Sequence, residues 1–306
     1  METIRAAALA TTSRFGYARI MRIEFLKMQG LGNDFLVFDA AGIAADTRMD
    51  SGLLRALADR HTGVGFDQAL MLESPRDAAS RVFYRVFNSD GGEVEQCGNG
   101  ARCIAALLYS RAPQLGRDLT MGCPGGTVHA RVRDDGLVSV DMGVPNFDPR
   151  SVPMQAEAYA DTYSLTIDGA DLEFSALSMG NPHVVLRVAD VKTAPVTELG
   201  LKIQQHPRFP KRANVGFMQI LDRSHIRLRV FERGAGETLA CGTGACAAAA
   251  VGQRLRLLDG EVRVDLPGGT ALVSWAGPDQ PIWLTGPATF VFTGSIDLTR
   301  FTGAKQ

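Results

Sequence analysis

The chain has 306 residues, is 45% hydrophobic and 21% charged, and carries a formal net charge of −1 at pH 7. This balance predicts an ordinary soluble globular protein that is large enough for two domains. It argues against a basic nucleic-acid surface, and no apolar run approaches the roughly 18 residues of a membrane span.

The first part of the chain predicts an extension followed by a strand and a turn. Residues 1–20 hold a short apolar run, below the about 7–15 residues of a secretory hydrophobic region. We expect a disordered extension here, with a transit peptide as the alternative. Residues 22–28 then predict a strand, and Asn33 lies on a turn before the next strand. A dinucleotide site is excluded at residues 30–35, because the third glycine and the following helix are missing.

The chain from residue 50 alternates between helical and strand patterns. Residues 50–61 have the spacing and caps of a helix. Residues 66–72 predict a strand near whose start an exposed Gln68 lies, and residues 82–87 predict a strand that delivers Asn88 to a glycine-rich loop. That loop ends at Cys97, where a helix apolar on nearly all sides begins. A helix of this kind is buried, so we expect it at the centre of a β-rich domain.

A cysteine-bearing stretch of the chain occurs twice. Residues 85–103 and 229–247 match at nine of nineteen positions, where average composition gives roughly one match by chance. Cys97 aligns with Cys241, 144 residues later (241 minus 97). Four further anchors recur in the same order, which indicates gene duplication; they are 32–33 with 180–181, 64–66 with 215–217, 124–127 with 267–270, and 143 and 147 with 286 and 290.

The second half of the chain repeats the plan of the first. A linker over 149–153 precedes a turn at 179–183, a strand over 184–188 and a helix over 196–204, and an apolar helix over 245–251 follows Cys241. Short strands follow each apolar helix, over 120–141 and 261–292. The fold class is therefore α+β, with two pseudo-symmetric duplicated domains in which strands wrap around a central apolar helix. We expect them at 21–148 and 149–306, with the last strand free to pack back on the first half.

The five cysteines are expected to be free thiols in a reducing, cytoplasmic compartment, because their number is odd and no signal peptide is recognisable. Their spacings do not match structural zinc sites, and we expect no metal. Cys103, Cys123 and Cys246 lie in apolar or unmatched settings and are interpreted as inert.

Cys97 and Cys241 differ from the other three because each precedes Gly-x-Gly at the start of a helix. Free N–H groups and the helix dipole at such a position lower a thiol pKa and bind a carboxylate. Two facing sites of this kind would place one sulfur on either side of the carbon attached to that carboxylate. A thiolate and a thiol so placed can remove and return a proton, which inverts the carbon. No lysine has a context that predicts pyridoxal phosphate, so no cofactor is expected.

At these residues the chain resembles diaminopimelate epimerase, the cofactor-independent enzyme family of lysine biosynthesis, from Met21 to the C-terminus. Gln29 departs from the pattern, since the family usually has His there. The motifs that carry the resemblance are 27–35, 88–91, 97–103, 180–183, 232–234 and 241–244.

The resemblance implies the interconversion of LL- and meso-diaminopimelate, with Cys97 and Cys241 as the acid/base pair. It implies a homodimer and no partner beyond the small-molecule substrate. His183 is a candidate for orienting the site or for a structural role. The residues implied to bind substrate are Gly98, Asn99, Gly242 and Thr243 at the reacting carboxylate, and Asn33, Gln68, Asn88, Asn181, Asn214, Glu232 and Arg233 at the amino groups and the far carboxylate.

Two alternatives stay open. Proline racemase and hydroxyproline epimerase look like the same two-cysteine duplicated fold, although Arg233 favours a long dicarboxylate, because a guanidinium can bind a carboxylate with two hydrogen bonds. A thiol–disulfide redox protein that pairs Cys97 with Cys241 is the second alternative.

Overall fold

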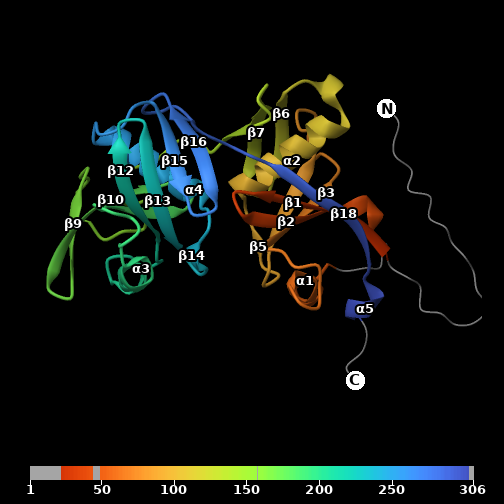
Figure 1. Ribbon diagram of the computed structural model, residues 1–306, viewed down its shortest axis with the longest axis horizontal. Coiled ribbons are helices and arrows are strands. Elements are labelled where there is room, and N and C mark those ends of the chain that lie inside the picture. Colours follow the sequence, from red (N-terminus) through yellow and green to blue (C-terminus); the bar gives the residue numbers. More distant parts are fainter. Residues whose placement is uncertain (1–21, 44–48, 157, 303–306) are drawn as a thin grey trace, which may run out of the picture.

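The computed structural model describes residues 22–43, 49–156 and 158–302. These residues form two lobes that lie side by side along the long axis of the molecule (Figure 1). Among the described residues, no helix is long and apolar enough to cross a membrane.

The first lobe contains most of the first half of the chain. Its strands and helices are β1 (Arg22–Gly30), β2 (Asn33–Asp39), α1 (Ser51–Ala58), β3 (Gln68–Glu73), β4 (Phe83–Asn88), β5 (Glu93–Val94), α2 (Gly98–Arg111), β6 (Asp118–Cys123), β7 (Gly126–Val132) and β8 (Val138–Asp141), with short 3-10 turns at Ala40–Gly42 and Pro113–Leu115.

The second lobe follows the same order of elements. It comprises β9 (Tyr163–Ile167), β10 (Ala170–Ser178), β11 (Pro182–Arg187), α3 (Val196–Gln205), β12 (Asn214–Asp222), β13 (His225–Glu232), β14 (Gly236–Thr238), α4 (Gly242–Arg254), β15 (Glu261–Leu266), β16 (Gly269–Trp275) and β17 (Ile282–Gly286). The chain then crosses to the first lobe as β18 (Thr289–Asp297) and α5 (Thr299–Thr302).

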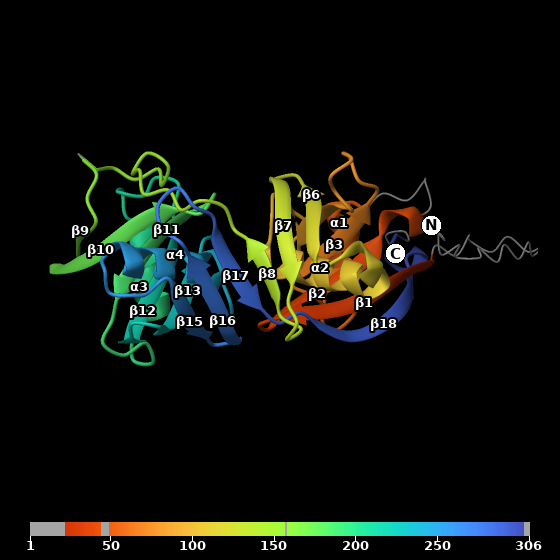
Figure 2. The same cartoon turned by 90° about the horizontal axis from the view of Figure 1, so that it is seen from above.

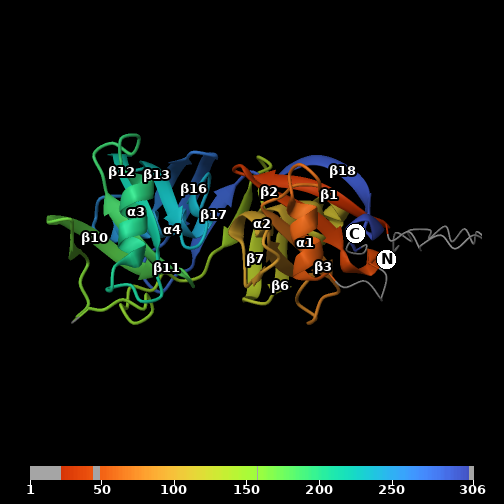
Figure 3. The ribbon, with the colours of Figure 1, turned by 90° about the horizontal axis from the view of Figure 1, so that it is seen from below.

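Strand pairing is repeated between the lobes. β18 pairs with β1 as β9 pairs with β10, and the parallel pair β2–β3 around α1 matches the parallel pair β11–β12 around α3. The parallel contact of β4 with β6 likewise matches that of β13 with β15. Figure 3 shows α1 and α3 on the same side of the molecule, one on each lobe. The predicted α+β class and duplicated arrangement are confirmed.

The strand register corrects one of the anchors that indicated the duplication. Phe35 pairs with Gln68 in the first lobe, and His183 pairs with Asn214 in the second. Gln68 and Asn214 therefore hold equivalent places at the starts of β3 and β12. The segment 64–66 lies before β3 while 215–217 lies inside β12, so these two segments are alike in sequence but not equivalent in structure.

The two lobes join through strands and a shared core. β8 and β17 pair antiparallel at the junction (Figure 2). α2 and α4 contribute to one apolar cluster, in which Ile104 and residues 245–250 have no exposed surface. The prediction that both apolar helices are buried is confirmed.

A cluster of charged residues ties the first strands of the first lobe together. The carboxylate of Asp34 lies 2.5 Å from Lys27 Nζ and 2.7 Å from Arg60 Nη2, which also contacts Asp67 at 2.7 Å. Burial opposes the charge of Asp34, yet the hydrogen bonds from Arg60 and Lys27 hold its pKa well below the usual range. Asp34, the central carboxylate of this ion-pair cluster (Lys27, Asp34, Arg60 and Asp67), directly follows Asn33 at the start of β2.

Candidate active site

Cys97 is the N-cap residue of α2. Its backbone is extended, with φ −140° and ψ 116°, and the N–H of Gly100 donates to its sulfur at 3.5 Å. A Cβ at Gly100 would lie 3.0 Å from Leu70 Cδ2, so glycine allows the helix to begin against the core. The thiol therefore sits at the positive end of a buried helix.

Cys241 has the same place at the start of α4. Its backbone is also extended, with φ −113° and ψ 106°, and its side chain is 4% exposed. The sulfur lies 3.1 Å from Glu232 Oε2 and 3.6 Å from Thr243 Oγ1. Because a carboxylate oxygen only accepts, Cys241 is a thiol that donates to Glu232 in this arrangement.

The N-termini of the two helices converge at the junction of the lobes. A Cβ at Gly242 would lie 2.9 Å from Leu284 Cδ2 on β17 and 3.6 Å from Asn99 Oδ1 on α2. A Cβ at Gly98 would lie 3.7 Å from the same Leu284 methyl group. The absence of side chains at both glycines thus lets the two helix starts approach one another.

A second contact joins the lobes beside these helix starts. The β1–β2 turn, residues 31–32, meets the turn between β15 and β16, where a Cβ at Gly268 would lie 2.0 Å from the carbonyl oxygen of Leu31. Gln29 closes the β1–β2 turn, since its side-chain oxygen accepts from Gly32 N at 3.2 Å. The side chain that departs from the family pattern is therefore built into this turn.

An Asn side chain from a turn lies beside the start of each of the two helices, and the two arrangements correspond. Asn33 Oδ1 lies 3.8 Å from Cys97 Sγ and accepts from Asn99 Nδ2 at 3.3 Å. In the second lobe, Asn181 Nδ2 donates to Thr243 Oγ1 at 3.3 Å. The turn residue of each lobe is thus bonded to the helix start that follows the cysteine.

The remaining predicted residues lie at the ends of the central strands. Gln68 Nε2 donates to Asn88 Oδ1 at 2.9 Å, and Gln68 Oε1 is buried without a partner. Gln68 is half-buried rather than exposed, because β4 covers one side of it. Asn214 Oδ1 accepts from the backbone N–H of Arg233 at 2.8 Å. The Arg233 side chain reaches the carbonyl of Lys211 at 3.4 Å.

His183 lies beside the Asn181 side chain of the second lobe. It is 1% exposed on β11, and its Nε2 lies 3.0 Å from Asn181 Oδ1. Burial, with a smaller contribution from the charge of Arg233, lowers the pKa of His183 to about 3. The ring is therefore neutral at physiological pH, and its Nε2–H donates to the amide oxygen, which only accepts.

The thiol acidities differ from the sequence-based expectation. Burial raises the pKa of Cys97, although the N–H of Gly100 and the guanidinium of Arg102 favour the thiolate. Burial and the Glu232 carboxylate raise the pKa of Cys241 well above its ordinary value. The expected lowering by the helix start is wrong for the free protein, because desolvation of a buried thiolate outweighs the helix dipole.

All five cysteines are free. Within the described ranges, no group of three or more His, Cys, Asp or Glu side chains could hold a metal ion. Sequence reasoning gave no role to Arg102, which contacts Asn99 with its side chain fully buried. The sequence signal for such a role is that Arg102 is the one charged residue between Gly98 and Tyr109 of α2.

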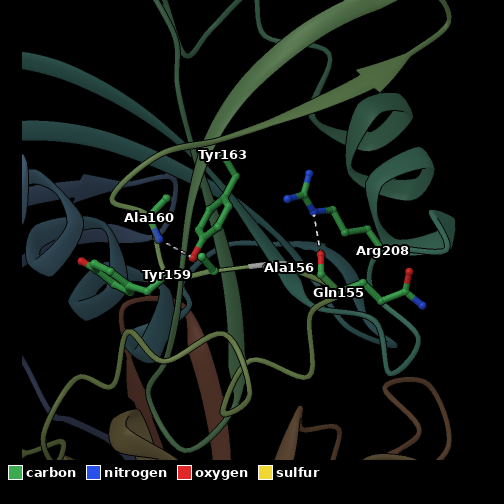
Figure 4. Close-up of a pocket in the computed structure, with 7 residues that line it drawn as sticks. Gln155, Ala156, Tyr159, Ala160, Tyr163 and Arg208 are labelled. Atoms are coloured by element: carbon green, nitrogen blue, oxygen red, sulfur yellow. Dashed lines mark hydrogen bonds between the residues drawn. The ribbon is translucent and has the colours of Figure 1, made fainter.

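A separate pocket of about 680 Å³ lies in the second lobe and contains none of the predicted site residues. The side chain of Arg208 is directed to Gln155, to whose carbonyl its Nε donates at 3.1 Å (Figure 4). The Arg208 guanidinium therefore already has a hydrogen-bond partner within the protein. The lining residues are Gln155, Ala156, Ala158, Tyr159, Ala160, Tyr163 and Arg208.

Comparisons with known proteins match nearly the whole chain. The family model described as diaminopimelate epimerase matches residues 25–147 and 175–291. A curated diaminopimelate epimerase of Thioalkalivibrio sulfidiphilus (strain HL-EbGR7) is 53% identical over 280 residues, which cover 91% of this chain and 100% of that protein. The protein of the same name from Azotobacter vinelandii (strain DJ / ATCC BAA-1303) is 51% identical over 278 residues, with the same coverage.

Solved structures share the fold at lower identity. A hydroxyproline epimerase from Agrobacterium vitis with bound trans-4-hydroxy-L-proline aligns with a TM-score of 0.64 at 15% identity, over 91% of this chain and 93% of that one. A methylitaconate-delta-isomerase aligns with a TM-score of 0.62 at 12% identity, over 94% and 99% of the two chains. At these identities the likeness concerns the fold alone.

Proposed function

This chain belongs to the diaminopimelate epimerase family, and from that premise we propose that it interconverts LL- and meso-diaminopimelate in lysine and cell-wall precursor biosynthesis. Cys97 and Cys241 are the acid/base pair. The observation that carries this proposal is the placement of the two thiols as N-caps of α2 and α4, whose glycine-rich starts converge at the lobe junction.

The chemistry is a proton transfer on each face of one carbon. One cysteine, as thiolate, takes the α-proton, and the other, as thiol, donates its proton to the opposite face of the carbanion. The two sulfurs thereby exchange protonation states, and the carbon is inverted without any other reactant. No electron sink is needed beyond the carboxylate, whose growing negative charge the N–H groups of both helix starts stabilise.

The raised thiol pKa values fit this role. Removal of the weakly acidic α-proton needs a strong base. A thiolate in a water-excluded site is a stronger base than a thiolate exposed to water. Binding of substrate supplies the ammonium group that offsets the cost of ionising the thiol. Ionisation of a thiol is therefore expected to be easier in the occupied site than in the substrate-free protein.

The amide groups would recognise the rest of the substrate. Gly98, Asn99, Gly242 and Thr243 hold the reacting carboxylate at the helix starts. Around them, acceptor groups such as the unpaired Gln68 Oε1 suit an ammonium, and the Arg233 guanidinium suits the far carboxylate. The set is completed by Asn33, Asn88, Asn181, Asn214 and Glu232, with His183 as the residue that orients Asn181.

The test is incubation of the reduced protein with LL-diaminopimelate in deuterated water without added cofactor. We expect the meso isomer with deuterium at the inverted centre. Replacement of either Cys97 or Cys241 by alanine should abolish its formation, whereas Cys246→Ala, a matched buried cysteine of α4, should retain it. Reaction of proline or hydroxyproline instead would move the protein to the racemase relatives. Absence of exchange with any amino acid would refute the proposal.

The exposed surface and the free thiols support a proposed assembly and location. Phe290, Val291 and Phe292 on β18 are 45%, 53% and 49% exposed, and β18 pairs only with β1 among the described strands. An apolar strand with an open edge is a template for a second copy, so the protein is a homodimer joined through β18. Light scattering should give twice the chain mass for the native protein and the monomer mass for Phe292→Lys. Five free thiols fit the reducing cytoplasm.

A further inference from the structure

Arg102 is a charged residue inside the core. Its side chain has no exposed surface, although it lies on the apolar helix α2. An isolated charge in such a place is costly unless other groups compensate it. None of the ion pairs found among the described residues includes Arg102, so its charge is not neutralised by a carboxylate there.

The hydrogen bonds of Arg102 lead to the reacting end of the site. Its Nη2 donates to Asn99 Oδ1 at 2.8 Å, and its Nε donates to the carbonyl of Pro287 at 3.4 Å. Its Nη1 is buried without any partner. Because Asn99 Oδ1 is occupied by the guanidinium, Asn99 presents its NH₂ group, which donates to Asn33 Oδ1 beside Cys97.

The space for the guanidinium is made by glycines of both lobes. A Cβ at Gly30 of β1 would lie 3.3 Å from Arg102 Nη2, and a Cβ at Gly286 of β17 would lie 3.3 Å from its Cζ. These contacts are tighter than a side chain normally accepts, so residues larger than glycine would displace the guanidinium. Arg102 is therefore enclosed at the lobe junction by β1, α2 and the end of β17.

The two halves differ in charge around their cysteines. At the duplication offset of 144 residues (246 minus 102), the residue equivalent to Arg102 is Cys246, which is neutral. The residue equivalent to Glu232 is Asn88 (232 minus 88), also neutral. Cys97 is thus influenced by the buried cation of Arg102, whereas Cys241 has the Glu232 carboxylate 3.1 Å away.

Building on the proposed function, we propose that Arg102 is a positioning residue that holds the Asn99 amide toward the reacting carboxylate and places a fixed positive charge behind Cys97, so that Cys97 ionises before Cys241. The pair of thiols is then asymmetric in the free enzyme, although the two halves share one fold. A substrate carboxylate bound at the start of α2 would be attracted by the positive charge of Arg102.

The other groups that face Cys97 do not supply this charge. They are Cys103 on α2, Tyr84 on β4 and Glu232 on β13. All three are neutral or negative, and Glu232 opposes ionisation of Cys97. Of the groups that face Cys97, only Arg102 and the helix N–H groups favour its thiolate.

The experiment measures the pH dependence of alkylation by iodoacetamide at Cys97 and Cys241 separately, by peptide mass spectrometry, in the absence of substrate. For Arg102→Gln we expect the midpoint of Cys97 to rise by about one unit, which is a tenfold slower reaction at neutral pH, while Cys241 keeps its midpoint. Arg102→Lys should keep the midpoint of Cys97. It should lower kcat/KM about tenfold, because one ammonium cannot reproduce both guanidinium hydrogen bonds, to Asn99 and to Pro287.

Tyr84→Phe is the matched control, since it removes a buried polar atom from the same core without changing charge, and it should leave both midpoints unchanged. A folded Arg102→Gln protein with an unchanged Cys97 midpoint, or with equal shifts at both cysteines, would overturn the proposal. If Arg102→Gln does not fold, Arg102→Lys decides, and wild-type kcat/KM in that variant would overturn it. The alkylation needs no substrate, so its outcome is distinct from failure of the epimerase assay.

Discussion

Glu232→Gln tests how the second lobe controls the ionisation of its cysteine. The Glu232 carboxylate accepts from Cys241 Sγ at 3.1 Å and from Thr238 Oγ1 at 2.5 Å, so it is held in place. It raises the pKa of Cys241 because it repels the thiolate and accepts a hydrogen bond only from the thiol. Glutamine has nearly the same shape, carries no charge, and can donate an N–H to the thiolate.

The size of the effect follows from the distance. Two unit charges 3.1 Å apart interact by about 5 kcal/mol at an effective dielectric constant of about 20, which is an upper limit of about four pKa units. Relaxation and entry of water reduce this, and we expect the pKa of Cys241 to fall by about one to two units in Glu232→Gln. The fraction of thiolate at neutral pH then rises by about tenfold to a hundredfold.

The assay is the pH profile of Cys241 alkylation, read by peptide mass spectrometry on the substrate-free protein. Glu237→Gln is the matched control, because it removes a carboxylate from the neighbouring strand β14 that pairs with Arg229 at 2.6 Å instead of with a thiol. That variant should leave the Cys241 profile unchanged. An unchanged or raised Cys241 midpoint in Glu232→Gln would refute the electrostatic reasoning.

Three further predictions concern stability, the lobe contact and histidine ionisation. Asp34→Asn, which removes the central carboxylate of the ion-pair cluster, should lower the free energy of unfolding by about 3 kcal/mol at neutral pH. Folding lowers the pKa of Asp34. The difference in free energy of unfolding between wild type and variant, measured by urea melts, should therefore shrink as pH falls below about 4. A difference that stays constant over this range would contradict the reasoning. Gly268→Ala should raise KM and lower the melting temperature, since its Cβ would meet the backbone of the β1–β2 turn at 2.0 Å, whereas Gly125→Ala, at the equivalent place with a 3.1 Å contact inside one lobe, should keep the wild-type KM. The NMR signal of His183 should not titrate between pH 5 and 8, because its pKa is lowered to about 3, and a midpoint near 6.5 would count against the buried neutral ring.

The sequence by itself was enough for most elements of the first lobe, for both apolar helices and for the repetition, but it did not predict β9, β10, β12 or β13. The apolar helices after Cys97 and Cys241 were recognisable because burial on all sides leaves no polar face in a sequence. The equivalence of the two cysteines came from local identity, which survives duplication where a turn, a glycine and a helix start are all required. The resemblance also gathered the candidate residues from both halves, and the family is confirmed by the comparisons.

Tertiary structure alone decided how those elements meet. The register of β3 and β12 depends on pairings between distant segments, which local periodicity does not encode. The return of the last strand to the first half was an option from the sequence, and the pairing of β18 with β1 decides it. The acidity of the thiols was misjudged because the helix start is visible in the sequence while the depth of burial is not. Arg102 shows the same limit: its charge is written in the chain, but its enclosure by Gly30 and Gly286 arises only when strands of both lobes close around α2, and it is this enclosure that makes the charge strong.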